Sequence, residues 1–185
     1  MLPIIGISMG DPFGNGPEIT VKALNDQTVY DRCRPLVVGD RSAMEYALKV
    51  SKKVNGIDLK LHLVKDPSDG LYTYGTIDLL DLGLLKEEDI PDHSEEEDPA
   101  PFKVGACALG GECAFQYVKK VIELAMENKV DGTVTNALSK EAINMAGHHY
   151  SGHTEIYAHY TNTKKYAMML AHENLRVVHV STHVS

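Results

Sequence analysis

The chain has 185 residues, of which 43% are hydrophobic and 24% are charged, and this is the composition of an ordinary globular protein. The net charge is −8, and the sequence has no stripe of basic residues that could neutralise phosphate groups. This argues against binding to nucleic acid or to an anionic membrane surface. No apolar run approaches the roughly 18 residues that a membrane-spanning helix needs. Three cysteines that match no common zinc spacing indicate reduced thiols, and we expect a cytoplasmic protein.

Short apolar strands alternate with helical patterns along the chain. The N-terminal stretch lacks a basic region, so we interpret it as a first strand and not as a signal peptide. In chain order, the predicted elements are a strand at 3–8, a helix from 17 to 24, a strand at 35–39, a helix at 41–50, strands at 59–64 and 76–83, a helix within 105–128, a strand at 131–135, a helix at 139–147, and strands at 165–171 and 174–183. This alternation predicts an α/β fold with a largely parallel sheet.

An acidic stretch at 86–103 interrupts the alternation. Eight of its 18 residues are Asp or Glu. Because runs of like charge usually remain solvated, we interpret it as a surface excursion between two elements. An acidic segment that binds a partner is the less favoured alternative.

A glycine-rich loop, MGDPFGNGPEI, follows the first predicted strand. Its three glycines permit a tight turn and a close approach of the backbone, and a helix begins at Pro17. Asp11 and Glu18 add charge, so the loop could bind an anion or a cofactor. The spacing matches neither the dinucleotide fingerprint nor a P-loop, and a simple helix connection explains the loop equally well.

A second loop, Gly152-His153-Thr154-Glu155, also runs into a predicted helix. His153 offers an imidazole and Thr154 a hydroxyl group, and the N–H groups of the helix that follows favour an anionic substrate group. The alternative is that Thr154 merely caps its helix, with Glu155 favourable in the first turn.

Seven of the nine histidines lie between His148 and His183, which raises the hypothesis of a metal site. We expect His148, His149, His159 and His172 to be solvent-exposed. His183 differs, because it lies at the carboxyl end of a strand that we predict to be buried, where open α/β sheets place their ligands. A catalytic metal normally has about three protein ligands, so one histidine does not make a site.

Three separated segments, GISMGDPFGNGPEITVKAL, DGTVTNALSKEAINMAGHHYSGHTEIYAHYT and KKYAMMLAHENLRVVHVSTHVS, together resemble the 4-hydroxythreonine-4-phosphate dehydrogenase family. This family includes paralogues that act on 4-phospho-threonate and 4-phospho-erythronate. The resemblance implies an isocitrate/isopropylmalate dehydrogenase-like two-domain fold, with residues 1–135 in the first α/β domain and 136–185 in part of the second. The chain has little more than half the family's usual length, so we expect an N-terminal fragment that lacks the second half of the fold.

The resemblance also implies roles for particular residues. His153 and Thr154 would bind the substrate, and His183 would be the first of three histidine ligands of a divalent metal (Zn, Mg or Co). The other two ligands and most cofactor-binding segments of the family lie beyond this chain. Lys140 is the catalytic candidate, for a carboxylate or phosphate contact or for proton transfer, although a solvated lysine explains it equally well. Family members usually carry a proline in the turn where this chain has Asn136 and Ala137.

The activity that the resemblance implies is oxidation, with decarboxylation, of a phosphorylated four-carbon hydroxy acid by NAD or NADP, in pyridoxine biosynthesis. The enzyme would be a homodimer with a shared active site, and the 185 residues alone would be inactive, with exposed apolar strand edges. One alternative is a metal-dependent hydrolase or aldolase, with three or more ligands among His148, His149, His153, His159, His179 and His183. The other is a non-catalytic, truncated binding module.

Overall fold

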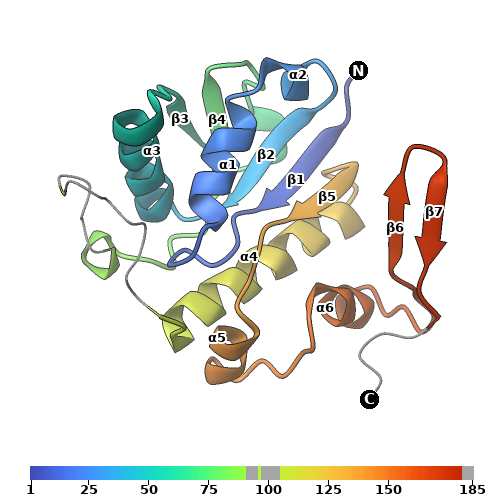
Figure 1. The fold of residues 1–185 in the computed structure, drawn as a ribbon. Coiled ribbons are helices and arrows are strands. Elements are labelled where there is room, and N and C mark those ends of the chain that lie inside the picture. Colours follow the sequence, from blue (N-terminus) through green and yellow to red (C-terminus); the bar gives the residue numbers. More distant parts are fainter. Residues whose placement is uncertain (91–95, 97–104, 181–185) are drawn as a thin grey trace.

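The computed structural model describes residues 1–90, 96 and 105–180 (Figure 1). Most of the predicted acidic excursion therefore lies outside the described residues. The helices and strands are β1 (Ile4–Ser8), α1 (Gly16–Leu24), α2 (Gln27–Tyr30), β2 (Arg34–Gly39), α3 (Arg41–Asn55), β3 (Lys60–Val64), β4 (Thr76–Asp81), α4 (Ala108–Met126), β5 (Gly132–Thr135), α5 (Lys140–Met145), α6 (His153–Tyr160), β6 (Met169–His172) and β7 (Leu175–Val178), with short 3-10 turns at Pro67–Asp69 and Glu87–Asp89.

Five strands form one parallel sheet in the order β3-β4-β2-β1-β5. Strand β1 pairs on both sides, and its Gly6 lies opposite Leu36 of β2 and Thr133 of β5. The predicted α/β fold with a largely parallel sheet is confirmed. Because β1 and β5 are parallel neighbours, their carboxyl ends meet at one edge of the sheet, which is where open α/β sheets bind ligands.

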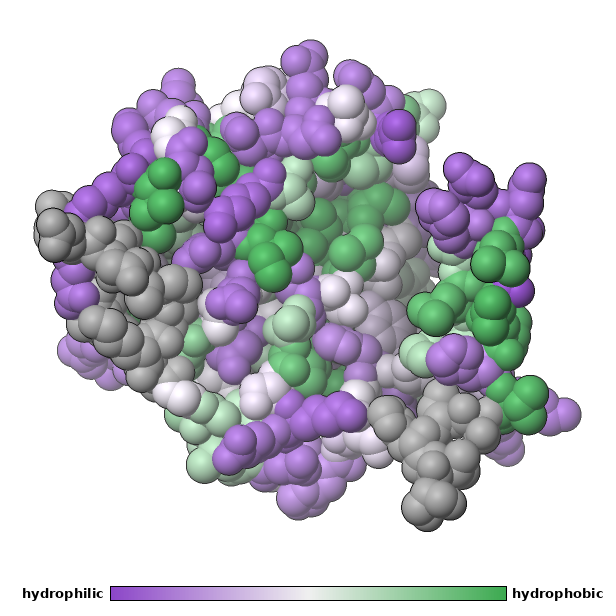
Figure 2. Space-filling model, in the orientation of Figure 1, coloured by the Kyte–Doolittle hydropathy of each residue, from purple (hydrophilic) through white to green (hydrophobic). Residues whose placement is uncertain are grey.

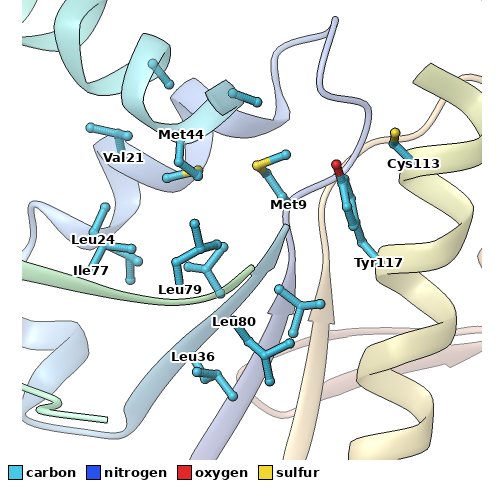
Figure 3. Close-up of a cluster of buried hydrophobic side chains, with 14 of the residues drawn as sticks. Met9, Val21, Leu24, Leu36, Met44, Ile77, Leu79, Leu80, Cys113 and Tyr117 are labelled. Carbon is cyan, nitrogen blue, oxygen red and sulfur yellow. The ribbon is translucent and has the colours of Figure 1, made fainter. Parts of the chain in front are cut away.

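Helices cover both faces of this sheet. Figure 3 shows Val21 of α1 and Met44 of α3 on one side of the strands, with Tyr117 of α4 on the other. The strands between them are apolar on both faces, as expected for a doubly covered parallel sheet. The fully buried side chains include Leu36, Ile77, Leu79, Met44, Val21 and Tyr117.

Helices α5 and α6 pack on α4 and extend the fold beyond β5 (Figure 1). A second apolar cluster joins them, in which Phe115, Val118 and Ile122 of α4 meet Ile143 of α5 and Ile156 of α6. Gly111 makes the close approach possible, because a Cβ there would lie 2.0 Å from the carbonyl oxygen of Ala142. The helix that carries His153 is therefore positioned by α4 as well as by the sheet.

Strands β6 and β7 form a separate antiparallel hairpin, with Leu170 opposite Val177. All eight strand residues are exposed, and Figure 2 shows hydrophobic residues gathered on the hairpin. The prediction of a buried last strand at 174–183 is wrong for the residues that the structure describes, since β7 is exposed and ends at Val178. The separate expectation that the last two strands of the 185-residue chain would leave apolar residues uncovered is confirmed for β6 and β7. In the described part of the chain, no helix is long and apolar enough to cross a membrane.

Candidate active site at the carboxyl end of β5

The glycine-rich loop after β1 is locked to the turn after β5. Gly10 has a φ of +82°, and a Cβ there would lie 2.5 Å from the carbonyl oxygen of Ala137. The main-chain N–H of Asp11 donates to the same oxygen at 3.1 Å. Glycine is required at position 10 both for its backbone conformation and for the space it leaves. The loop therefore fixes the course of the chain between β5 and α5.

Asn136 connects this turn to the first helix. Its main-chain N–H donates to the carbonyl oxygen of Ser8 at 3.2 Å. Its side-chain amide donates to Thr20 Oγ1 at 2.7 Å and to the carbonyl oxygen of Gly16 at 3.4 Å. A proline at position 136 would lack both donors. The amide contacts thus hold the turn between β5 and α5 against the first helix.

A hollow of about 370 Å³ lies between β5 and α6. Most of its lining residues are threonines or tyrosines, and its wall includes the predicted substrate-binding residues His153 and Thr154. The lining residues are Thr133, Thr135, His153, Thr154, Tyr157, Ala158, Thr161, Thr163 and Tyr166. Neither Lys140 nor the glycine-rich loop contributes to this wall. The structure therefore brings two of the four predicted site residues together.

Among the described residues of this wall, His153 is the only ionisable side chain apart from the two tyrosines. Burial lowers the pKa of His153, and a hydrogen bond with the main chain of Asn136 partly offsets this by raising it. Its Nε2 atom is buried without a hydrogen-bond partner among the described residues. A histidine with a lowered pKa is neutral at pH 7, and a neutral imidazole nitrogen can pair with a substrate hydroxyl group.

The first turn of α6 does not use Thr154 as its cap. The N-cap residue is Gly152, and the Glu155 carboxylate accepts a hydrogen bond from the main-chain N–H of Ser151. Thr154 is exposed at the wall of the hollow. The alternative in which Thr154 merely caps the helix is therefore wrong, whereas the expected favourable position of Glu155 in the first turn is confirmed.

The other predicted residues lie outside the hollow. Lys140 is the first residue of α5 and is exposed, while Ser139 caps that helix by accepting from the N–H of Ala142 at 3.2 Å. His183 lies outside the described residues. Across 1–90, 96 and 105–180, no three His, Cys, Asp or Glu side chains come together as a metal site, so the hydrolase or aldolase alternative gains no support there.

The prediction that His148 is solvent-exposed is wrong. Its Nε2 atom lies 2.6 Å from Glu112 Oε2, and its ring stacks on Phe115 with the centroids 3.6 Å apart. His148 is therefore half-buried and has a structural role, because it ties the segment after α5 to α4. His149, His159 and His172 are exposed, as expected.

Sequence reasoning also missed Thr133, Thr135 and Tyr157 as parts of the wall. Two signals were present in the sequence. Thr133 and Thr135 are alternate residues of one strand and so share a face, and Tyr157 follows His153 by one helical turn. Neither signal shows which strand face meets which helix face, and that contact makes the hollow.

The parallel sheet, with its glycine-rich loop and its hollow at a carboxyl strand end, places the chain in the class of open α/β folds, which as a class bind ligands at this edge. A family model described as "Pyridoxal phosphate biosynthetic protein PdxA" matches residues 31–185. The chain belongs to this family.

Curated relatives include the D-threonate 4-phosphate dehydrogenase of Cupriavidus necator, which is 41% identical over 184 residues covering 99% of this chain and 50% of the relative. The 4-hydroxythreonine-4-phosphate dehydrogenase of Desulforapulum autotrophicum is 38% identical over 98% of this chain and 49% of its own length. A crystal structure of a 4-hydroxythreonine-4-phosphate dehydrogenase from Burkholderia phymatum matches with a TM-score of 0.84 and 41% identity, over 100% of this chain and 51% of that one. The chain thus spans about half the length of these relatives.

Proposed function

We propose that this chain is the substrate-binding part of a dehydrogenase that oxidises, with decarboxylation, a phosphorylated four-carbon hydroxy acid. The substrate would be 4-phosphohydroxy-threonine or 4-phospho-threonate, with NAD or NADP as the oxidant and a divalent metal (Zn, Mg or Co). The names of the relatives support the substrate class and the dehydrogenase reaction. We further propose a cytoplasmic homodimer with a shared active site, which serves pyridoxal phosphate biosynthesis if 4-phosphohydroxy-threonine is the substrate.

The observation that carries this proposal is that His153 and Thr154 both line the hollow, together with several threonines and tyrosines. Among the residues that the structure describes, no carboxylate lines the hollow, so none of them repels a phosphate or carboxylate group there. Hydroxyl groups donate to such oxygens. The Nε2 atom of His153 is buried without a partner among the described residues, and a rotation of the ring toward the hollow would let it pair with a substrate hydroxyl group. A small, phosphorylated hydroxy acid presents both kinds of group.

The roles of this chain's residues follow from their positions. His153 and Thr154 would grip the substrate, and the exposed Lys140 would act only on a group that extends beyond the hollow. A bound nicotinamide would accept the hydride, and a bound metal would stabilise the developing negative charge. The described residues do not form a metal site by themselves. We assign His183 to the metal on the family resemblance alone.

An assay of the full-length natural protein tests this proposal. With a divalent metal and NAD or NADP supplied, we expect reduced nicotinamide and carbon dioxide to form from 4-phospho-threonate or 4-phosphohydroxy-threonine, and not from the unphosphorylated acids. His183→Ala should greatly reduce the metal content measured by mass spectrometry, whereas Lys140→Ala should leave it unchanged. Absence of turnover with every phosphorylated substrate would overturn the proposal and favour a non-catalytic binding module.

A further inference from the structure

Tyr157 lies one helical turn after His153, on the same face of α6, and both side chains line the hollow. The Tyr157 hydroxyl group donates to Thr133 Oγ1 at 2.8 Å. Thr133 belongs to β5, and its position in the sheet is set by pairing with Gly6 of β1. This hydrogen bond therefore links the helix that carries His153 directly to the sheet.

Helix α6 has few other anchors. It has eight residues, its only buried residue is Ile156, and no side chain caps Gly152 at its start. Helices this short are marginal without tertiary contacts. Ile156 and Tyr160 hold the face that packs on α4. The face toward β5 is held at the last turn by the Tyr157–Thr133 bond and at the first turn by the contact of His153 with the main chain of Asn136.

We propose that Tyr157, through its hydrogen bond to Thr133, is a positioning residue that holds His153 in its substrate-binding orientation. Burial raises the pKa of Tyr157, and the hydrogen bond to Thr133 partly offsets this. The phenol group therefore stays protonated and can donate at neutral pH. The inference rests on the proposed function for its kinetic test, but not for its spectroscopic one.

The spectroscopic test follows the titration of the His153 ring by NMR in the full-length natural protein, without substrate. In Tyr157→Phe and Thr133→Val, the lowered pKa of His153 should move up toward its ordinary value, because the ring becomes better hydrated. Thr133→Ser keeps the hydroxyl group and should restore the original titration. Tyr160→Phe is the matched control, since Tyr160 is on the same helix but packs against Phe115 instead of lining the hollow.

The kinetic test is a double-mutant cycle. Tyr157→Phe and Thr133→Val should each raise KM by about two- to twelvefold, the range that one hydrogen bond spans, with little change in kcat. The double variant should be no worse than either single one, because both remove the same bond. In a His153→Ala background, Tyr157→Phe should have no further effect on KM, because Tyr157 acts through His153.

Three results would overturn the inference. They are an unchanged His153 titration in Tyr157→Phe, additive effects of Tyr157→Phe and Thr133→Val, and a KM effect of Tyr157→Phe that persists without His153. If the wild-type protein has no dehydrogenase activity, the proposed function fails, and the NMR titration alone still decides the role of Tyr157.

Discussion

Strand β4 of the parallel sheet and strand β7 of the hairpin have similarly apolar sequences but opposite surroundings. In β4, Ile77 and Leu79 are fully buried between helices. In β7, Leu175 is 66% exposed and Val177 is 46% exposed. Apolar sequence alone therefore does not make a core, because burial requires a second layer, and this chain supplies one for the sheet but not for the hairpin.

Because β4 is covered and β7 is not, a leucine-to-alanine substitution should lower the free energy of unfolding much more in β4 than in β7. Leu79→Ala should lower the free energy of unfolding by about 2–5 kcal/mol, because it leaves a cavity in a packed core. Leu175→Ala should change it by about 0.5 kcal/mol or less, because its side chain already contacts water. Chemical denaturation of the two variants measures both values, and equal costs would contradict the division into a packed sheet and an uncovered hairpin.

Removing a hydroxyl group should also lower the free energy of unfolding more in the buried sheet region than near the hairpin, with a smaller difference than for the leucines. Asp40 is 1% exposed, and its carboxylate accepts from the Tyr117 hydroxyl group at 2.7 Å and from the N–H of Leu85 at 2.9 Å. Tyr117→Phe leaves one buried carboxylate oxygen without that partner and should cost about 1–3 kcal/mol. Tyr166→Phe, in an exposed tyrosine before the hairpin, should cost almost nothing in the same denaturation experiment.

The exposed hairpin should affect association more than folding. Leu170 and Val177 lie opposite each other on one face, so two lysines there would place like charges on the apolar surface. Leu170→Lys combined with Val177→Lys should raise the monomer fraction of the 185-residue chain in sedimentation velocity, with little change in unfolding stability. Val54→Lys, at an exposed apolar residue of α3, serves as the control. Unchanged self-association of the double variant would show that the hairpin is not the contact surface.

The smallest expected effect is a pH dependence at the junction of α4 and the segment after α5. Burial raises the pKa of Glu112, but hydrogen bonds from Gln116 and His148 and the charge of Lys119 outweigh it, so that its pKa is lowered overall. A carboxyl group with a lowered folded-state pKa contributes stability above its unfolded pKa, and this stability is lost as the pH falls through the folded value. Stability should thus decline in acid, and His148→Gln should flatten that decline in denaturation curves recorded across the acid range.

Local patterns in the sequence predicted most elements of the sheet correctly. The helix expected within 105–128 is observed at 108–126, because its apolar residues repeat with the helical period over several turns. The same patterns misjudged the burial of the last strand, because burial depends on what covers a strand and not on its own residues. His148 was misjudged for a similar reason, since its partners Glu112 and Phe115 lie more than thirty residues earlier in the chain.

Only part of the candidate site was accessible to sequence reasoning. His153 and Thr154 form a local motif, and the structure places both in the hollow. Tyr157 and Thr133 acquire their roles only when α6 meets β5, a contact that no local pattern specifies. Asn136 was noticed only as a departure from the family's pattern, whereas its amide joins the turn after β5 to α1.

The central claim is that the hollow between β5 and α6 binds the substrate through His153. The most direct test compares His153→Ala with His159→Ala in the full-length natural protein, because both histidines are on α6 but His159 is exposed and does not line the hollow. We predict that His153→Ala raises KM for the phosphorylated hydroxy acid by about tenfold or more with its metal content unchanged, while His159→Ala matches the wild type. Equal KM values for the wild type and His153→Ala would contradict the assignment of this hollow as the substrate site.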